Sequence, residues 1–100
     1  MEKILVISDS LVTFKVIERM LGNGYEVSLS ARYDENKVNS NDTVIIDSSL
    51  YEKSMLPSSK KFIVMVNENY MLDDFISDIV SNGGEYIMLP LNEKSLKDKI

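Results

Sequence analysis

Two aspartates follow two of the most hydrophobic runs in the chain. Asp9 comes after Ile-Leu-Val-Ile at residues 4–7 and Ser8, and Asp47 directly follows Thr-Val-Ile-Ile at residues 43–46. Short, unbroken β-branched runs of this kind are typical of strands buried in a parallel α/β sheet. The carboxyl ends of such strands form the edge where ligands bind. The two carboxylates could therefore hold a divalent cation, or one of them could accept a phosphoryl group.

The composition narrows the chemistry that is available. The chain has 100 residues, 44% of them hydrophobic, with a net charge of −5, no cysteine and no histidine. It is long enough for one domain with a core, and its acidity argues against binding nucleic acid or an anionic membrane. Thiolate metal sites, a cysteine nucleophile and the commonest general base are all missing. The sequence contains no secretory signal and no membrane span, so we expect a cytoplasmic protein.

Strands alternate with helical patterns along the chain. Hydrophobic runs predict five strands, at residues 3–7, 25–29, 43–46, 62–66 and 86–89. Helical spacing predicts an amphipathic helix over residues 11–21, a second over 71–80, and a short last helix that Asn92 caps. This alternation predicts one parallel sheet with helices on both faces.

The other two crossovers carry weak helical patterns. Residues 31–42 are polar almost throughout, which speaks against a helix packed on the core. Residues 48–61 offer a few apolar side chains for one or two helical turns before Pro57 ends them. We therefore expect both helices to be shortened or missing. The last helix is also short, which suggests that the native gene product continues past Ile100, for example into an output domain.

Five segments, taken in order, resemble the receiver domain of bacterial response regulators. They are Lys3-Ile4-Leu5-Val6-Ile7-Ser8-Asp9-Ser10, Gly24-Tyr25-Glu26-Val27, Val44-Ile45-Ile46-Asp47, Phe62-Ile63-Val64-Met65-Val66 and Gly84-Glu85-Tyr86-Ile87-Met88-Leu89-Pro90-Leu91. The resemblance spans essentially all of residues 1–100 and implies a single receiver-like domain. The implied fold is a flavodoxin-like (βα)5 three-layer sandwich with five parallel strands.

The resemblance also implies a role for five positions, of which this sequence keeps only part. Asp47 stands where the family has its phosphoryl-accepting aspartate, and Tyr86 where it has its switch aromatic. The family's acidic pair for Mg²⁺ is reduced to Ser8 and Asp9. Asn67 stands where the family has a threonine or serine, and Leu89 stands where the family has a lysine before a proline.

These departures predict a receiver that has lost phosphorylation control. Phosphoryl transfer to a carboxylate requires a metal ion and a fixed cation to neutralise the developing charge, and Leu89 supplies no donor. We expect no enzymatic activity, no cofactor, and at most weak Mg²⁺ binding at Asp9 and Asp47. The predicted function is a pseudo-receiver that acts as a signalling or regulatory interaction module. A true receiver phosphorylated on Asp47 and a small-ligand-binding flavodoxin-like domain are the alternatives. Against the latter, no glycine-rich phosphate loop follows the first strand.

The partner surface is also implied by the resemblance. Receivers dimerise or bind targets through the face made by helix four, strand five and helix five, and this chain keeps that face better than the phosphorylation site. We expect a protein partner or a homodimer there, with acidic and basic side chains paired across a two-fold axis. We expect no direct contact of this domain with nucleic acid or membrane. The residues expected at the surface are Asp74, Asp78, Tyr86, Lys94 and Lys97.

Overall fold

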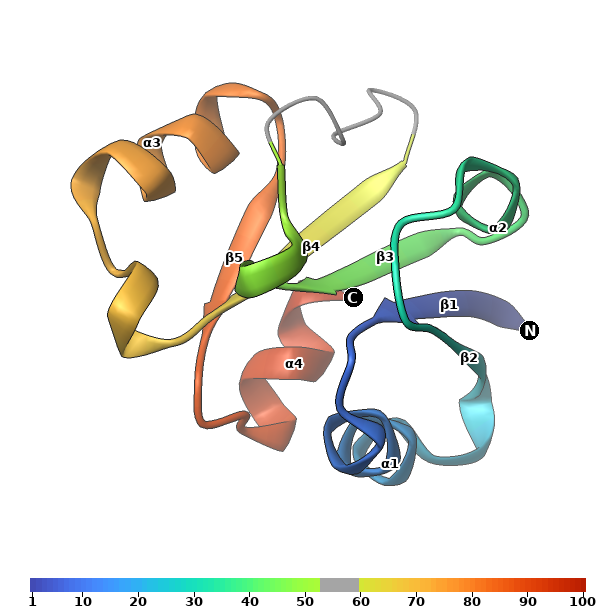
Figure 1. Cartoon of the computed structure of the whole chain (residues 1–100). Coiled ribbons are helices and arrows are strands. Elements are labelled where there is room, and N and C mark those ends of the chain that lie inside the picture. The colour runs from blue at the N-terminus through green and yellow to red at the C-terminus, as the bar shows by residue number, and fades with distance from the viewer. Residues whose placement is uncertain (53–59) are drawn as a thin grey trace.

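A computed structural model describes residues 1–52 and 60–100 (Figure 1). Within them, one sheet of five parallel strands has the order β2-β1-β3-β4-β5. Strand order 2-1-3-4-5 is that of the flavodoxin-like fold, so the expected fold class is confirmed. The strands are β1 (Glu2–Ile7), β2 (Tyr25–Ser30), β3 (Thr43–Asp47), β4 (Lys61–Val66) and β5 (Glu85–Met88).

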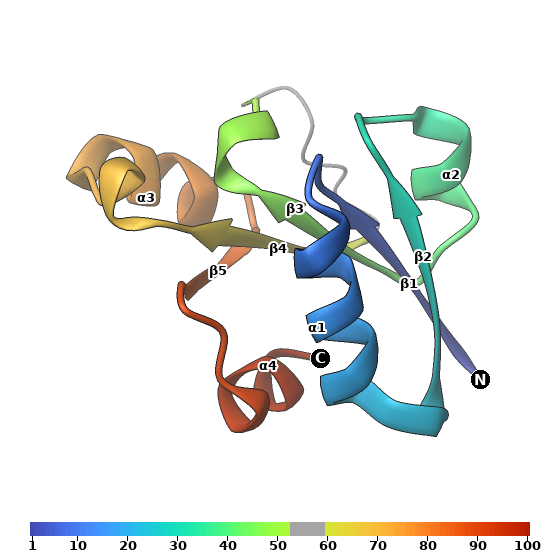
Figure 2. The ribbon, with the colours of Figure 1, turned by 60° about the horizontal axis from the view of Figure 1, so that its bottom comes forward.

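Helices cover both faces of the sheet. The described residues form α1 (Leu11–Leu21), α2 (Glu35–Asn39), α3 (Asp73–Ser81) and α4 (Glu93–Lys99). Helices α1 and α4 lie on one face, and α2 and α3 lie on the other (Figures 1 and 2). In the receiver pattern α3 and α4 take the places of helices four and five. None of the helices in residues 1–52 and 60–100 is long and apolar enough to cross a membrane.

Each face of the sheet builds its own core. Ile4, Val6 and Ile45 pack under α1 and α4, whereas Leu5 and Val44 point to the layer of α2 and α3. Because successive strand residues point to opposite faces, a strand in the middle of this sheet must be apolar at every position. This requirement explains the continuous hydrophobic runs from which the strands were predicted.

Helix α1 begins and ends where the sequence predicts. The side chain of Ser10 caps it by accepting a hydrogen bond from the Thr13 N–H at 3.2 Å. Gly22 ends it at φ +70°, a conformation that favours glycine. The predicted stripe faces the core, with Phe14, Ile17 and Leu21 buried.

The first weak crossover holds more structure than the sequence suggests. Residues 35–39 form helix α2, whose start is capped by Asp34 through the N–H groups of Asn36 and Lys37. Val38 is the aliphatic residue of this segment and is fully buried. The polar sequence spoke against a core-packed helix here, but the structure has one, and it is shortened as expected. One buried side chain, Val38, and the cap at Asp34 thus hold a helix of five residues.

The second weak crossover begins with a 3₁₀ turn, η2 (Ser48–Leu50). The apolar residues at 55 and 56, and the predicted stop at Pro57, lie outside the described residues. Tyr51 follows the turn and is buried against the α3 side of the sheet.

Helix α3 differs from its prediction at both ends. It starts at Asp73 rather than at residue 71, because a 3₁₀ turn, η4 (Glu68–Tyr70), precedes it. Its inward face consists of Phe75, Ile76 and Ile79. Leu72 and Val80 were expected on that face but are 63% and 54% exposed.

Candidate functional site

The carboxyl ends of β1 and β3 bring Ser8 and Asp47 together. Ile7 pairs with Ile46 in the sheet, so the next residue of each strand lies at the same level. The Ser8 hydroxyl donates to Asp47 Oδ2 at 3.4 Å, which is long for a hydrogen bond between oxygens. Ser8 is buried and Asp47 is half-buried, so a neutral hydroxyl occupies the space beside the carboxylate.

Asp9 is exposed and does not cap α1, since Ser10 fills that position. Asp47 occupies the N-cap position of η2, but its side chain makes no capping hydrogen bond. In residues 1–52 and 60–100, no group of three or more Asp, Glu, His or Cys side chains could hold a metal ion. The two carboxylates are therefore not joined by further acidic ligands from the described chain.

Asn67 and Leu89 follow the ends of β4 and β5 at the same edge of the sheet. The Asn67 side-chain oxygen accepts from the Asn69 N–H at 2.9 Å and so caps η4. The Leu89 N–H donates to the Val66 carbonyl at 3.0 Å, which extends the pairing of β4 with β5. The Leu89 side chain packs against the core cluster under α1 and α4. The Asn67 side chain thus has a structural use, and the Leu89 side chain contributes only apolar surface.

Ser48, which follows Asp47 directly, was not among the site residues predicted from the sequence. Ser48 is buried, and its hydroxyl oxygen has no hydrogen-bond partner among the described residues. A buried hydroxyl without a partner is uncommon and costs free energy. The sequence does not predict the burial of Ser48, because that burial depends on how the following turn folds back onto the strand.

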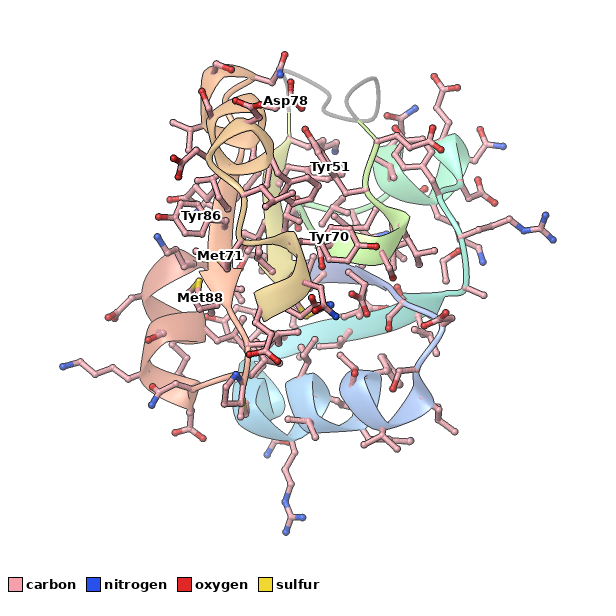
Figure 3. All side chains as sticks on the ribbon, turned by 60° about the vertical axis from the view of Figure 1, so that its left-hand side comes forward. Tyr51, Tyr70, Met71, Asp78, Tyr86 and Met88 are labelled. Atoms are coloured by element: carbon pink, nitrogen blue, oxygen red, sulfur yellow. The ribbon has the colours of Figure 1, made fainter. Side chains whose placement is uncertain are left out.

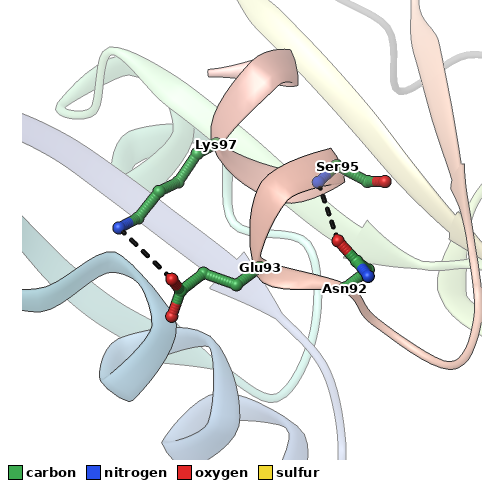
Figure 4. Close-up of polar contacts among 4 residues, drawn as sticks. All are labelled: Asn92, Glu93, Ser95 and Lys97. Atoms are coloured by element: carbon green, nitrogen blue, oxygen red, sulfur yellow. Dashed lines mark hydrogen bonds and ion pairs between the residues drawn. The ribbon is translucent and has the colours of Figure 1, made fainter.

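The charged residues expected on the partner face differ in exposure and in their contacts. Asp74 and Lys94 are exposed on α3 and α4. Asp78 is half-buried and turned toward the turn after β3, where its carboxylate accepts from the Tyr51 hydroxyl at 2.8 Å (Figure 3). Lys97 lies 3.7 Å from Glu93 within α4 (Figure 4). Two of the four charged groups therefore already have partners within the chain.

An aromatic cluster around Phe75 was not predicted from the sequence either. Tyr51 meets the Phe75 ring edge-on, with centroids 5.5 Å apart and an interplanar angle of 83°, and Tyr70 lies at 5.4 Å. Tyr51 is only 8% exposed. Burial, and secondly the hydrogen bond to the Asp78 carboxylate, raise the pKa of the Tyr51 hydroxyl far above its ordinary value. The cluster joins the turn that follows Asp47 to α3.

Tyr86 and Met88 lie on the α3 side of edge strand β5. Their strand partners, Val64 and Val66, belong to the core under α2 and α3, which fixes the face to which they point. Met88 lies two residues from Tyr86 on the same face of β5 and is 46% exposed, and Met71, just before α3, is 41% exposed (Figure 3). This face therefore has an apolar centre that the charged residues of the prediction did not include.

The architecture matches solved receiver domains. A response-regulator receiver domain from Clostridium thermocellum has a TM-score of 0.80 at 23% identity, covering 99% of this chain and 90% of that one. The signal receiver domain of a Vibrio parahaemolyticus LuxO repressor protein has a TM-score of 0.80 at 13% identity, with coverages of 97% and 85%. The ChxR receiver domain of Chlamydia trachomatis has 0.74 at 18%, with 97% and 90%.

Sequence comparison adds nothing further, because no family model and no curated protein matches the chain. At such low identities the likeness concerns the fold. The chain has the fold of response-regulator receiver domains, as its sequence pattern predicted.

Proposed function

We propose that this chain is an atypical receiver, a signalling or regulatory protein-interaction module that works without phosphorylation. The observation that carries this proposal is the group of side chains around Asp47. Its carboxylate has the neutral Ser8 hydroxyl beside it, while the position before Pro90 holds Leu89, which is partly buried and packs against the core. Phosphorylation of Asp47 would add about two negative charges, without a fixed cation to balance them.

Two further features support the proposal. The Asn67 side chain is occupied by its bond to the Asn69 N–H, so a rotation toward Asp47 would break the cap of η4. Tyr86, at the family's switch position, packs against the core on the α3 side. A switch that pairs these two residues would have to dismantle local structure, which opposes a phosphorylation-driven change.

The experiment is a phosphorylation assay on the purified chain. We expect no stoichiometric addition of a phosphoryl group by intact-mass spectrometry after treatment with acetyl phosphate or phosphoramidate and Mg²⁺. Asp47→Asn is the matched control, because it keeps the shape of the side chain. A gain of one phosphoryl group in the wild type but not in Asp47→Asn would favour the second candidate, a true receiver phosphorylated on Asp47. The half-exposed carboxylate at the strand end is the feature that supports this candidate.

We place the docking surface for a protein partner or a second copy on the face of α3, β5 and α4. Tyr86 and the exposed Met71 and Met88 provide an apolar centre, and aromatic and methionine side chains are enriched at interfaces. The surrounding charged residues of this surface are Asp74, Asp78, Lys94 and Lys97.

Binding is tested with Tyr86→Ala combined with Met88→Ser. We expect this variant to lose co-purification of the partner or self-association, because hot spots are concentrated at apolar centres. Glu35→Lys on α2 is an exposed control that should bind as the wild type does. Undiminished binding by the double variant would remove this face from the proposal.

A further inference from the structure

The exposed large apolar side chains gather in two places. Apart from Met1, those of the described residues lie on α1 or beside α3 and β5. On α1, Leu11, Val12 and Val16 are 61%, 74% and 38% exposed; we call these three the α1 patch. Just before α3, Met71 and Leu72 are 41% and 63% exposed, and Leu72 lines a surface hollow with Asp73 and Asp74; we call Met71 and Leu72 the α3 patch. Exposed apolar residues that are grouped rather than scattered point to a binding surface.

The two patches carry opposite charges. Lys15 and Arg19 flank the α1 patch, and the acidic Glu18 beside them already pairs with Lys15 at 3.7 Å. The α3 patch is bordered by Asp73 and Asp74, and α3 contains no basic residue. A basic apolar surface stands out on a chain with a net charge of −5. Each patch is thus chemically complementary to the other.

The two patches of one molecule cannot reach each other. Helix α1 packs on one face of the sheet and α3 on the opposite face (Figures 1 and 2). The contact must therefore join two molecules, with α1 of one copy on α3 of the next. Such a head-to-tail contact uses two different surfaces, so it builds a closed ring or an open chain rather than a two-fold dimer.

Internal pairing weakens the alternative two-fold contact. Asp78 already accepts from Tyr51 at 2.8 Å, and Lys97 already lies 3.7 Å from Glu93. Salt bridges that replace such contacts gain little, since the groups must first leave their present partners. Of the four charged groups of the head-to-tail contact, Lys15 is paired in this way, with Glu18 at 3.7 Å, whereas Asp73, Asp74 and Arg19 are exposed.

We propose that the α3 patch binds the α1 patch of a second copy of this chain, so that the protein self-associates head to tail. This inference rests on the proposed docking role of α3 and names its occupant. Two short helices form a small interface, so the association is weak and reversible.

The test uses charge reversal on each side, followed by sedimentation velocity. The wild-type average mass should rise above 11.4 kDa as the concentration approaches about 1 mM. Lys15→Glu/Arg19→Glu should weaken self-association about tenfold or more, and so should Asp73→Lys/Asp74→Lys. An equimolar mixture of the two variants should associate again, because each altered helix then meets an oppositely charged one.

Lys94→Glu/Lys97→Glu is the matched control, since it also reverses two charges on one helix. Head-to-tail association survives this change, whereas a two-fold contact through α4 is lost. If Lys94→Glu/Lys97→Glu abolishes association and Lys15→Glu/Arg19→Glu does not, the inference is wrong and the docking face of α3, β5 and α4 stands.

Two further results overturn the head-to-tail contact: a wild type that stays monomeric at about 1 mM, or a mixture of folded variants that does not associate. Loss of partner binding by the Tyr86 and Met88 variant is a separate measurement, so the proposed function is judged independently. Circular dichroism verifies folding, since lysines in the first turn of α3 oppose the helix dipole. Val12→Asp, at a 74% exposed position, provides a second α1 variant with little expected cost to folding.

Discussion

Replacing Tyr51 by Phe should lower the stability of the domain by about 1.5 kcal/mol. The change removes the hydroxyl that donates to Asp78 at 2.8 Å and leaves the ring contact with Phe75 in place. Hydrogen bonds to charged groups contribute about 1.5–3 kcal/mol. The low end applies, because Asp78 is half-buried and retains a contact with the Asn82 side-chain amide at 3.3 Å.

The assay is urea unfolding followed by circular dichroism. With a denaturant dependence of about 1–3 kcal/mol per molar, a loss of this size moves the midpoint down by roughly 0.5–1.5 M. Tyr70→Phe is the matched control, since Tyr70 packs on the same Phe75 ring and is only half-buried. Its midpoint should move by less than about a third as much, as surface changes usually do.

The pH dependence gives an independent check of the same bond. Burial and the Asp78 carboxylate raise the pKa of Tyr51 in the folded protein above its unfolded value of 10.0. The neutral hydroxyl is therefore favoured by folding, and its contribution is complete below pH 10 and lost as the pH rises toward the folded pKa. The stability difference between wild type and Tyr51→Phe should stay constant from about pH 6 to 9 and shrink above about 10. Equal midpoints for Tyr51→Phe and Tyr70→Phe at neutral pH would refute the reasoning.

Three other predictions concern the elements around the site. Val38→Ala should destabilise the domain by about 2 kcal/mol in urea unfolding, because it empties a fully buried anchor, whereas the exposed Lys37→Ala should change stability little. Ser10→Ala should cost about 1 kcal/mol in the same assay, since it removes the cap of α1, and an unchanged midpoint would contradict that role. Mg²⁺ should bind more weakly than about 1 mM in a titration followed by the amide NMR shifts of Asp9 and Asp47; saturation well below that concentration would show additional ligands.

The sheet was predictable from the sequence because strands that are buried on both faces appear there as continuous hydrophobic runs. Each central strand of a parallel sheet must be apolar at consecutive positions, and polar turn residues separate the runs. The same logic placed α1, whose cap at Ser10 and stop at Gly22 are local chemistry. The resemblance to receiver domains then implied the flavodoxin-like fold class, with which the pairing of β1 between β2 and β3 agrees.

The helices that were misjudged depend on single contacts rather than on patterns. Periodicity needs several apolar positions, so it could not identify α2, which rests on Val38 and the cap at Asp34. It also counted Leu72 and Val80 as part of the inward face of α3, although the preceding 3₁₀ turn delays the start of the helix. Apolar residues at the margin of a helical stripe can face solvent, and their exposure is decided by the neighbours of the helix.

The edge of the sheet shows the same division between what topology determines and what side chains determine. Strand ends place Asp47 next to Ser8 whatever the surrounding sequence, so this juxtaposition was predictable. The bond between Tyr51 and Asp78 joins residues that are 27 positions apart, one after a turn and the other on a helix. No spacing in the sequence predicts it. That bond ties the turn after Asp47 to α3 by a route that does not involve Tyr86. A fixed position of α3 is what its proposed docking role requires, because a docking helix must be held in place to present its exposed side chains.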